Sequence, residues 1–161
     1  MAKERIKIDT KKVKALRADI DARQHKLIGN MVNAADEVLL NTEADSKALV
    51  GRDSGRLENS INASKAIYRN DVISGRVGSN LVYALRRHEE QPRIGTYNKY
   101  EDGVKYEGYY FNGRGELTRA KPNVGGYKAG RKYLENAANI NQKHWRNNLT
   151  EAVIDTYKGL G

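Results

Sequence analysis

The chain has 161 residues, a formal net charge of +9, 39% hydrophobic residues and no cysteine. This length predicts a single domain over residues 1–161, and the lack of cysteine excludes disulfides, thiolate metal sites and a cysteine nucleophile. The start, MAKERIKIDTKKVK, lacks the apolar core of a signal peptide, and no run of about 18 apolar residues occurs, so we expect a soluble chain made in the cytoplasm. The low hydrophobic fraction leaves two alternatives: part of the chain is extended and solvated, or partner subunits cover part of its surface.

The positive charge is concentrated in two blocks. Residues 1–30 and residues 93–132 each carry nine basic and four acidic side chains, whereas the two remaining segments are close to neutral. Such blocks favour anionic partners, either nucleic acid or acidic protein surfaces. For the N-terminal block, solubility alone is the alternative explanation.

The first predicted element is a long helix over residues 10–49. Asp9 or Thr10 is placed to cap its start, after an N-terminal tail formed by residues 1–9. Gly29 predicts a bend or a break, because glycine costs about 1 kcal/mol relative to alanine inside a helix. Apolar residues recur at steps of three and four and predict one packed face, formed by Val13, Leu16, Ile20, Leu27, Met31, Ala34, Val38 and Leu39.

The stretch RDSGRLENSI, residues 52–61, predicts a sharp corner after this helix. Gly51 fits the position just past the helix end. In Asp53-Ser54-Gly55, the polar side chains can bond nearby backbone groups, and glycine tolerates a positive φ. Leu57 and Ile61 lie four residues apart, so one helical turn places them on the same face and lets them pin the corner.

A β-hairpin is predicted next, because INASKAIYR and VISGRVG alternate with period two around the turn sequence RND. Residues 78–91 permit either a short helix or an irregular edge segment. Residues 130–157 return to a helical pattern, with a break expected near residues 139–141 and Trp145 expected as a core anchor against the sheet. The predicted fold is α+β: a long N-terminal helix and a C-terminal helix packed on a small antiparallel sheet, with a long hairpin-containing loop.

That loop, residues 92–129, has an unusual composition. It contains both prolines, six of the ten tyrosines and the only phenylalanine. Asn112-Gly113 is a strong type I′ hairpin signal, so we expect strands at about 104–111 and about 115–120. Disordered segments are poor in aromatic residues, so an extended Tyr-rich arm is predicted. Its candidate partner-binding residues are Tyr97, Tyr100, Tyr106, Tyr109, Tyr110, Phe111, Arg114 and Arg119.

The arm has two interpretations. Aromatic residues interleaved with basic ones can stack on single-stranded bases and neutralise phosphates. The same mixture is typical of protein interfaces, where tyrosine and arginine are enriched. Because a lone hairpin is only marginally stable, an arm that reaches a neighbouring subunit gains the packing that it lacks. We therefore favour contact with protein.

The sequence offers no candidate catalytic, cofactor-binding or metal-binding residue. His25, His88 and His144 lie far apart and lack partners at metal-ligand spacing. Neither G-x-x-x-x-G-K-[ST] nor G-x-S-x-G occurs, and the adjacent carboxylates of Glu89 and Glu90 diverge. We expect a protein that is not an enzyme and uses no cofactor.

Two motifs, taken in order, resemble the head–tail adaptor or tail-completion proteins of long-tailed bacteriophages. The family pattern is Asp-(Thr/Ser)-Gly-x-Leu-x-x-Ser-Ile after the first helix, then Val-Gly-(Ser/Thr), Tyr-Ala and an acidic residue. The matching residues are Asp53, Ser54, Gly55, Leu57, Ser60 and Ile61, followed by Val77, Gly78, Ser79, Tyr83, Ala84 and Glu89. The resemblance covers about residues 10–91 and, more loosely, residues 130–157, whereas residues 92–129 are longer than is usual in the family.

The resemblance implies a non-enzymatic subunit of a hexameric or dodecameric homo-oligomeric ring in the phage neck. This ring would join the portal-side connector to the tail tube of the virion. The implied partners are other copies of the chain, a connector or stopper, and a tail terminator or tail tube, together with non-specific contact with passing DNA and no membrane. A channel-facing role for Arg114, Arg119 and Lys121 is a separate hypothesis. The runner-up function is a basic nucleic-acid-binding module that uses the Tyr/Arg-rich hairpin, and a small nuclease or toxin is third.

Overall fold

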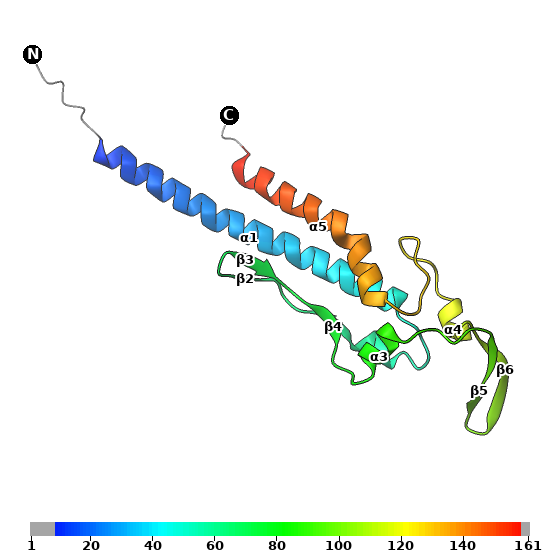
Figure 1. Ribbon diagram of the computed structural model, residues 1–161. Helices are drawn as coiled ribbons and strands as arrows, with labels where there is room; N and C mark the ends of the chain where they lie inside the picture. The colour runs from blue at the N-terminus through cyan, green and yellow to red at the C-terminus, as the bar shows by residue number, and fades with distance from the viewer. Residues whose placement is uncertain (1–8, 159–161) are drawn as a thin grey trace, which may run out of the picture.

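A computed structural model describes residues 9–158 and shows an elongated α+β protein, as the sequence predicts (Figure 1). The predicted tail up to residue 8 lies outside the described residues. Three antiparallel sheets of two strands each accompany the two long helices. The elements are α1 (Thr10–Leu49), α2 (Arg56–Ser60), β1 (Ile61–Ala63), β2 (Ile67–Arg69), β3 (Val72–Ser74), β4 (Val77–Ser79), α3 (Ala84–Glu89), β5 (Thr96–Glu101), β6 (Val104–Phe111), α4 (Glu116–Arg119) and α5 (Tyr133–Tyr157).

Helix α1 runs without interruption for 40 residues. Asp9 caps its start, because the carboxylate accepts hydrogen bonds from the backbone N–H groups of Lys11 and Lys12 at 3.0 and 3.3 Å. The sequence predicts a bend or a break at Gly29, and no break occurs, since the helix formers on both sides outweigh one unfavourable residue. Gly51 follows the C-cap residue Val50, as the sequence predicts, but the helix ends on an extended Val50 with φ −68° and ψ 145° and Gly51 does not adopt a positive φ.

Helix α5 packs antiparallel against α1 (Figure 1). The side-chain amide of Asn30 donates to Thr156 Oγ1 at 3.0 Å, and that of Asn141 donates to Asp45 Oδ2 at 2.6 Å, so the two helices are joined at both ends of their contact. The break expected near residues 139–141 is wrong: α5 is one helix of 25 residues, although its ribbon bends in Figure 1.

The buried core lies where the end of α1 meets α2, β1, α3 and the start of α5. Its fully packed members are Leu49, Val50, Leu57, Ile61, Ala84, Tyr133 and Ala137. Trp145 is half-buried and lies outside this cluster, so the anchoring role expected for it is wrong. The reason is that α5 packs chiefly on α1 and not on a sheet.

The hairpin predicted around RND is confirmed. Strands β2 and β3 pair across Asn70 and Asp71, whose φ angles of 51° and 60° suit a type I′ turn. Strand β1 pairs with β4, and α3 fills the stretch predicted as a short helix or an edge segment. Carboxylates of α1 hold the segment in place, because Asp36 accepts from the Ala66 N–H and Glu43 from the Ala63 N–H, both at 2.6 Å.

The Tyr-rich arm contains a hairpin, but the expected strand pairing is wrong. Strand β6 pairs with the preceding β5 across Asp102-Gly103, and residues 116–119 form α4 instead of a strand. Asn112-Gly113 does turn the chain, with φ angles of 47° and 74°. Residues 116–119, Glu-Leu-Thr-Arg, favour a helix over a strand. The β5–β6 hairpin projects at the end of the molecule opposite the start of α1 (Figure 1).

Candidate assembly interface

The two sequence motifs meet in the folded chain. Leu57 and Ile61 of the first motif are buried in the same core as Ala84 of the second, and Val77 packs against this core. The hydroxyl groups of Ser60 and Ser79 form a hydrogen bond of 2.7 Å between the two motifs. Gly55 has a φ of 81° just before α2, which is the turn that the first motif predicts. The motifs therefore build the corner of the fold.

The acidic residues of the motifs hold later segments of the chain. Asp53 Oδ1 accepts from Lys99 Nζ on β5 at 2.7 Å, which replaces the bond to the turn backbone that the sequence predicts for it. Glu89 Oε2 accepts from Lys132 Nζ, just before α5, at 2.7 Å, and this bond lowers the pKa of Glu89. Gly78 pairs with Asn62 between β1 and β4, and Tyr83 is exposed at the start of α3.

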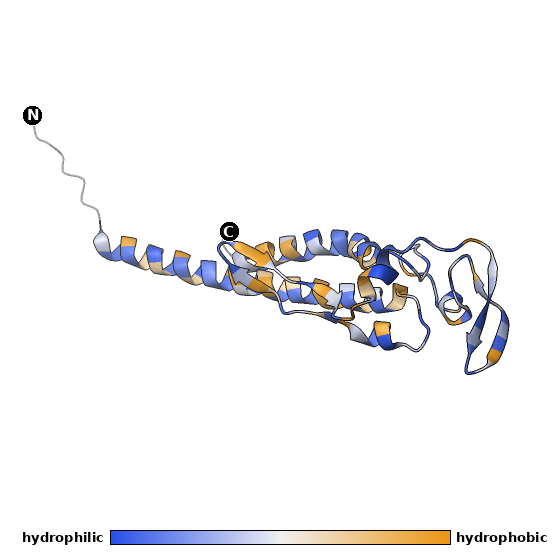
Figure 2. Ribbon diagram, turned by 60° about the horizontal axis from the view of Figure 1, so that its bottom comes forward, coloured by the Kyte–Doolittle hydropathy of each residue, from blue (hydrophilic) through white to orange (hydrophobic). Residues whose placement is uncertain are grey.

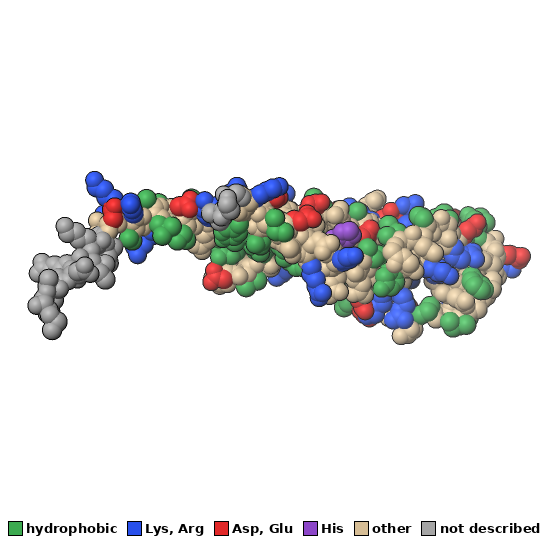
Figure 3. All heavy atoms as spheres, turned by 90° about the horizontal axis from the view of Figure 1, so that it is seen from above, with side chains coloured by type: hydrophobic (Ala, Val, Ile, Leu, Met, Phe, Trp, Pro, Cys, Tyr) green, Lys and Arg blue, Asp and Glu red, His purple; other side chains and the backbone are tan. Residues whose placement is uncertain are grey.

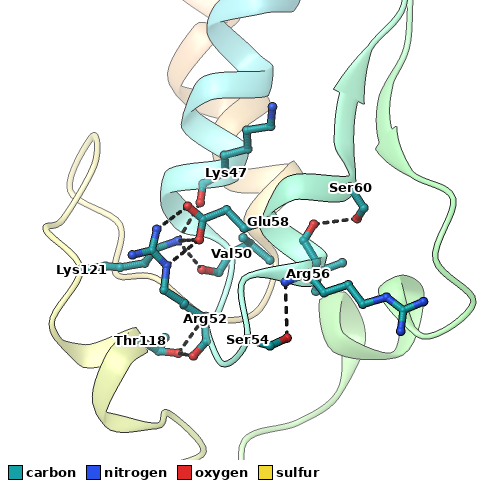
Figure 4. Close-up of polar contacts among 10 residues, drawn as sticks. Lys47, Val50, Arg52, Ser54, Arg56, Glu58, Ser60, Thr118 and Lys121 are labelled. Carbon is teal, nitrogen blue, oxygen red and sulfur yellow. Dashed lines mark hydrogen bonds and ion pairs between the residues drawn. The ribbon is translucent and has the colours of Figure 1, made fainter.

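A buried lysine ties the segment after the hairpin to the end of α1 (Figure 4). Lys121 Nζ donates to the backbone oxygens of Lys47 and Val50 at 2.7 and 2.9 Å and lies 3.0 Å from Glu58 Oε2. Only 8% of its side chain is exposed. Lysine is almost never buried to this degree unless it is paired, and here three acceptors surround the ammonium group. Lys121 is therefore unavailable to line a channel, contrary to the hypothesis drawn from the sequence.

Two further contacts complete this connection, which we call the joint (Lys47, Val50, Arg52, Glu58, Thr118 and Lys121; Figure 4). The Arg52 guanidinium donates to both carboxylate oxygens of Glu58 at 2.8 and 2.6 Å. Thr118 Oγ1 accepts from the Arg52 N–H at 3.0 Å and donates to the Arg52 carbonyl oxygen at 3.1 Å. Hydrogen bonds from Arg52 and then Lys121 lower the pKa of Glu58 below its ordinary value.

Sequence reasoning missed the joint. The single sequence signal for the joint is that Glu58 lies inside the first motif. Arg52 and Thr118 are 66 residues apart, and no local pattern predicts that they meet. Arg119, expected on the partner-binding arm, has a structural contact instead, because its guanidinium donates to the Tyr109 carbonyl oxygen at 3.1 Å.

The aromatic residues of the arm divide into a packed group at its root and a group of exposed rings. Tyr109 is buried, and its ring lies edge-on to those of Tyr110 and Tyr106, with centroids 4.8 and 6.3 Å apart. Arg93 covers the half-buried Tyr97 ring at 3.8 Å from its centroid. Three rings of the arm are exposed, those of Tyr100, Tyr106 and Phe111, with 72%, 44% and 45% of their surface accessible. The pairing of Tyr100 with Lys105 and of Lys99 with Tyr106 places Tyr100 and Tyr106 on opposite faces of the hairpin. The sequence could not distinguish these two groups, because all of them occur in one run.

A second apolar surface is exposed on the first half of α1. Val13, Leu16 and Ile20 were predicted to pack, yet all three are exposed. The reason is that α5 ends opposite Asn30, so the earlier turns of α1 project beyond it (Figures 1 and 2). The molecule thus exposes apolar side chains near both of its ends.

Within residues 9–158, no group of three or more His, Cys, Asp or Glu side chains is arranged to hold a metal ion. No helix in this part of the chain is long and apolar enough to cross a membrane. No family model matches the chain, and no curated protein or solved structure matches it.

Proposed function

We propose that this chain is a structural subunit of the neck of a long-tailed bacteriophage. In this role it acts as a head–tail connector or tail-completion protein, which joins the portal-side connector to the tail tube as a ring through which DNA passes. The observation that carries the proposal is the projecting β5–β6 hairpin, which exposes the rings of Tyr100, Tyr106 and Phe111. Aromatic side chains are enriched at protein interfaces, so exposed rings on both faces of a projecting hairpin are suited to contact with a partner on either side.

The joint supports this role because it fixes the direction of the hairpin. Lys121 and Thr118 tie the end of the arm to α1 and Arg52, while Lys99 ties β5 to Asp53. A ring closes through head-to-tail contacts only when each subunit presents its two surfaces at a set angle. A hairpin held at its root by these hydrogen bonds meets that requirement, whereas a freely hinged arm does not.

The position of the two apolar surfaces also supports assembly. The exposed turns of α1 and the exposed rings of the hairpin lie toward opposite ends of an elongated molecule (Figures 1 and 2). A head-to-tail contact uses two different surfaces of each subunit. This arrangement therefore fits a chain that has one neighbour at each end. The motif residues that resemble the adaptor family build the corner at the end of α1, which lies between the two surfaces.

Assembly of purified protein tests the proposal. We expect light scattering to show rings, or complexes with the portal and tail-tube proteins of the same phage. Replacing Tyr100, Tyr106 and Phe111 with serine should abolish them while the protein stays folded, because none of the three belongs to the buried core.

The matched control replaces three other exposed apolar residues, Ile67, Val72 and Ile154, with serine, and it should assemble normally. Normal assembly of the hairpin variant would contradict the role of the hairpin. Failure of the wild type to associate with itself or with either neck protein would contradict the proposed function.

The alternative function, a nucleic-acid-binding module, stays a prediction. Stacking on bases needs free ring faces, but Arg93 covers Tyr97, and Lys99 lies 5.0 Å from the Tyr109 centroid. Steeply salt-dependent binding of a single-stranded oligonucleotide that is lost in the Tyr100, Tyr106 and Phe111 variant would favour it.

A further inference from the structure

A groove of about 760 Å³ lies between the root of the hairpin and the start of α5. The end of α1, the segment after α3, β5, β6 and the segment before α5 all contribute to its walls. Its charged lining is strongly one-sided, with one carboxylate, that of Glu90, and six basic side chains: Arg87, Arg93, Arg114, Lys128, Arg131 and Lys132. On the face seen in Figure 3, Lys and Arg side chains gather toward the hairpin end of the molecule.

Most of these cations have no counter-charge among residues 9–158. Arg87 lies 3.7 Å from Glu90, and Lys132 pairs with Glu89. Over residues 9–158, the other four cations, Arg93, Arg114, Lys128 and Arg131, form no ion pair. Like charges that line one groove repel one another, and an anion between them removes that repulsion.

Arg131 has hydrogen-bonding capacity that the described chain leaves unused. Its Nη1 donates to the amide oxygen of Gln91 at 2.8 Å, which is a neutral acceptor. Its Nε is buried and has no acceptor among the described residues. Buried polar groups are nearly always hydrogen-bonded, so a donor without a partner in the wall of a cationic groove indicates that a ligand supplies the acceptor or reorients the side chain.

Arg114 faces the same groove from the turn after β6. A Cβ placed on Gly130 would lie 3.5 Å from Arg114 Cδ, so the stem of this arginine rests over the glycine backbone. Its guanidinium makes no hydrogen bond with the described side chains, in contrast to that of Arg52 in the joint. A planar guanidinium held by its stem and free at its head is suited to bidentate pairing with an oxyanion.

We propose that this groove binds an acidic polypeptide segment of a partner protein, with Asp or Glu carboxylates on Arg93, Arg114, Lys128 and Arg131. A nucleic acid is disfavoured because the aromatic rings in the lining are occupied: Arg93 covers Tyr97, and Tyr110 packs edge-on to Tyr109. The exposed rings of the hairpin do not line the groove. The site is thus distinct from the exposed aromatic rings that the proposed function uses, and the two proposals can fail separately.

Fluorescence anisotropy with a labelled hexaglutamate peptide tests this site at low ionic strength. The comparison probes are hexaglutamine and a hexathymidylate oligonucleotide. The test variant carries Arg114→Gln and Lys128→Gln, and Arg93→Gln is a second, independent variant. The control carries Lys143→Gln and Arg146→Gln on the exposed face of α5, which changes the net charge equally.

We expect hexaglutamate to bind, hexaglutamine not to bind, and salt to weaken the binding. The double groove variant should bind about tenfold more weakly, and the α5 control should bind as the wild type does. Failure of hexaglutamate to bind, or equal losses in the groove and α5 variants, would overturn the proposal. So would tighter binding of hexathymidylate with the same sensitivity to the groove substitutions.

Discussion

Replacing Lys121 with methionine removes the ammonium group at the centre of the joint. Methionine keeps most of the volume of the side chain, so the change acts mainly on polar contacts. The carbonyl oxygens of Lys47 and Val50 each lose their bond to the ammonium group. Glu58 keeps its two bonds to Arg52, so one of its two cationic partners remains.

The expected loss follows from the burial of these groups. Removing one partner of a buried ion pair costs about 3–5 kcal/mol. We expect the lower end, about 3 kcal/mol, because Arg52 still neutralises Glu58 and because burial already lowers the pKa of Lys121, which means that the charged form pays a desolvation cost. For a chain of this size the melting temperature should fall by about 6–12 °C.

Thermal and urea unfolding followed by circular dichroism measures this loss. The control is Lys105→Met, because Lys105 lies 2.7 Å from Glu107 in an exposed pair on the hairpin. Exposed pairs contribute less than about 1 kcal/mol, so this variant should unfold close to the wild type. If the two variants lost the same stability, the joint would not be the connection that the structure indicates.

Two other substitutions probe the joint and the turn beside the groove. Because Arg52 holds the folded-state pKa of Glu58 below its unfolded value, the stabilisation is present above the unfolded value and is lost as the pH falls through the folded value. The advantage of the wild type over Glu58→Gln in melting temperature should therefore shrink between about pH 6 and about pH 3, and an advantage that is independent of pH would contradict this reasoning. Gly113→Ala should destabilise the protein by about 2 kcal/mol, since the residue has a φ of 74° and its Cβ would lie 2.7 Å from Pro92 Cβ. Gly103→Ala has a similar φ of 78° but open space, so it should cost about 1 kcal/mol in the same unfolding assay, and equal losses would show that the contact with Pro92 does not matter.

The hairpin shows why local signals predicted a structure but not its pairing. Both Asp102-Gly103 and Asn112-Gly113 suit a type I′ turn, and β6 lies between them. The choice of partner strand depends on what surrounds it. Residues 116–119 form a helix that places Thr118 against Arg52, so they are not available as a strand beside β6.

Local sequence determined where the long helices lie, where the corner turns and which motif residues are buried. The periodicity of residues 10–49, the positive φ of Gly55 and the spacing of Leu57 and Ile61 act over a few residues, and the structure agrees with each. These properties depend on backbone geometry and on one apolar face, which neighbouring residues specify.

Tertiary structure alone decided which apolar residues lack a partner and which charges are neutralised. Leu16 and Leu49 belong to the same helix, yet only Leu49 is buried, because α5 ends before it reaches the first turns of α1. Lys121 is buried in the joint, whereas Arg114 forms no ion pair within the described chain, although both belong to one basic block. Exposure and charge pairing depend on distances between segments that are remote in sequence, and those distances exist only once the chain has folded.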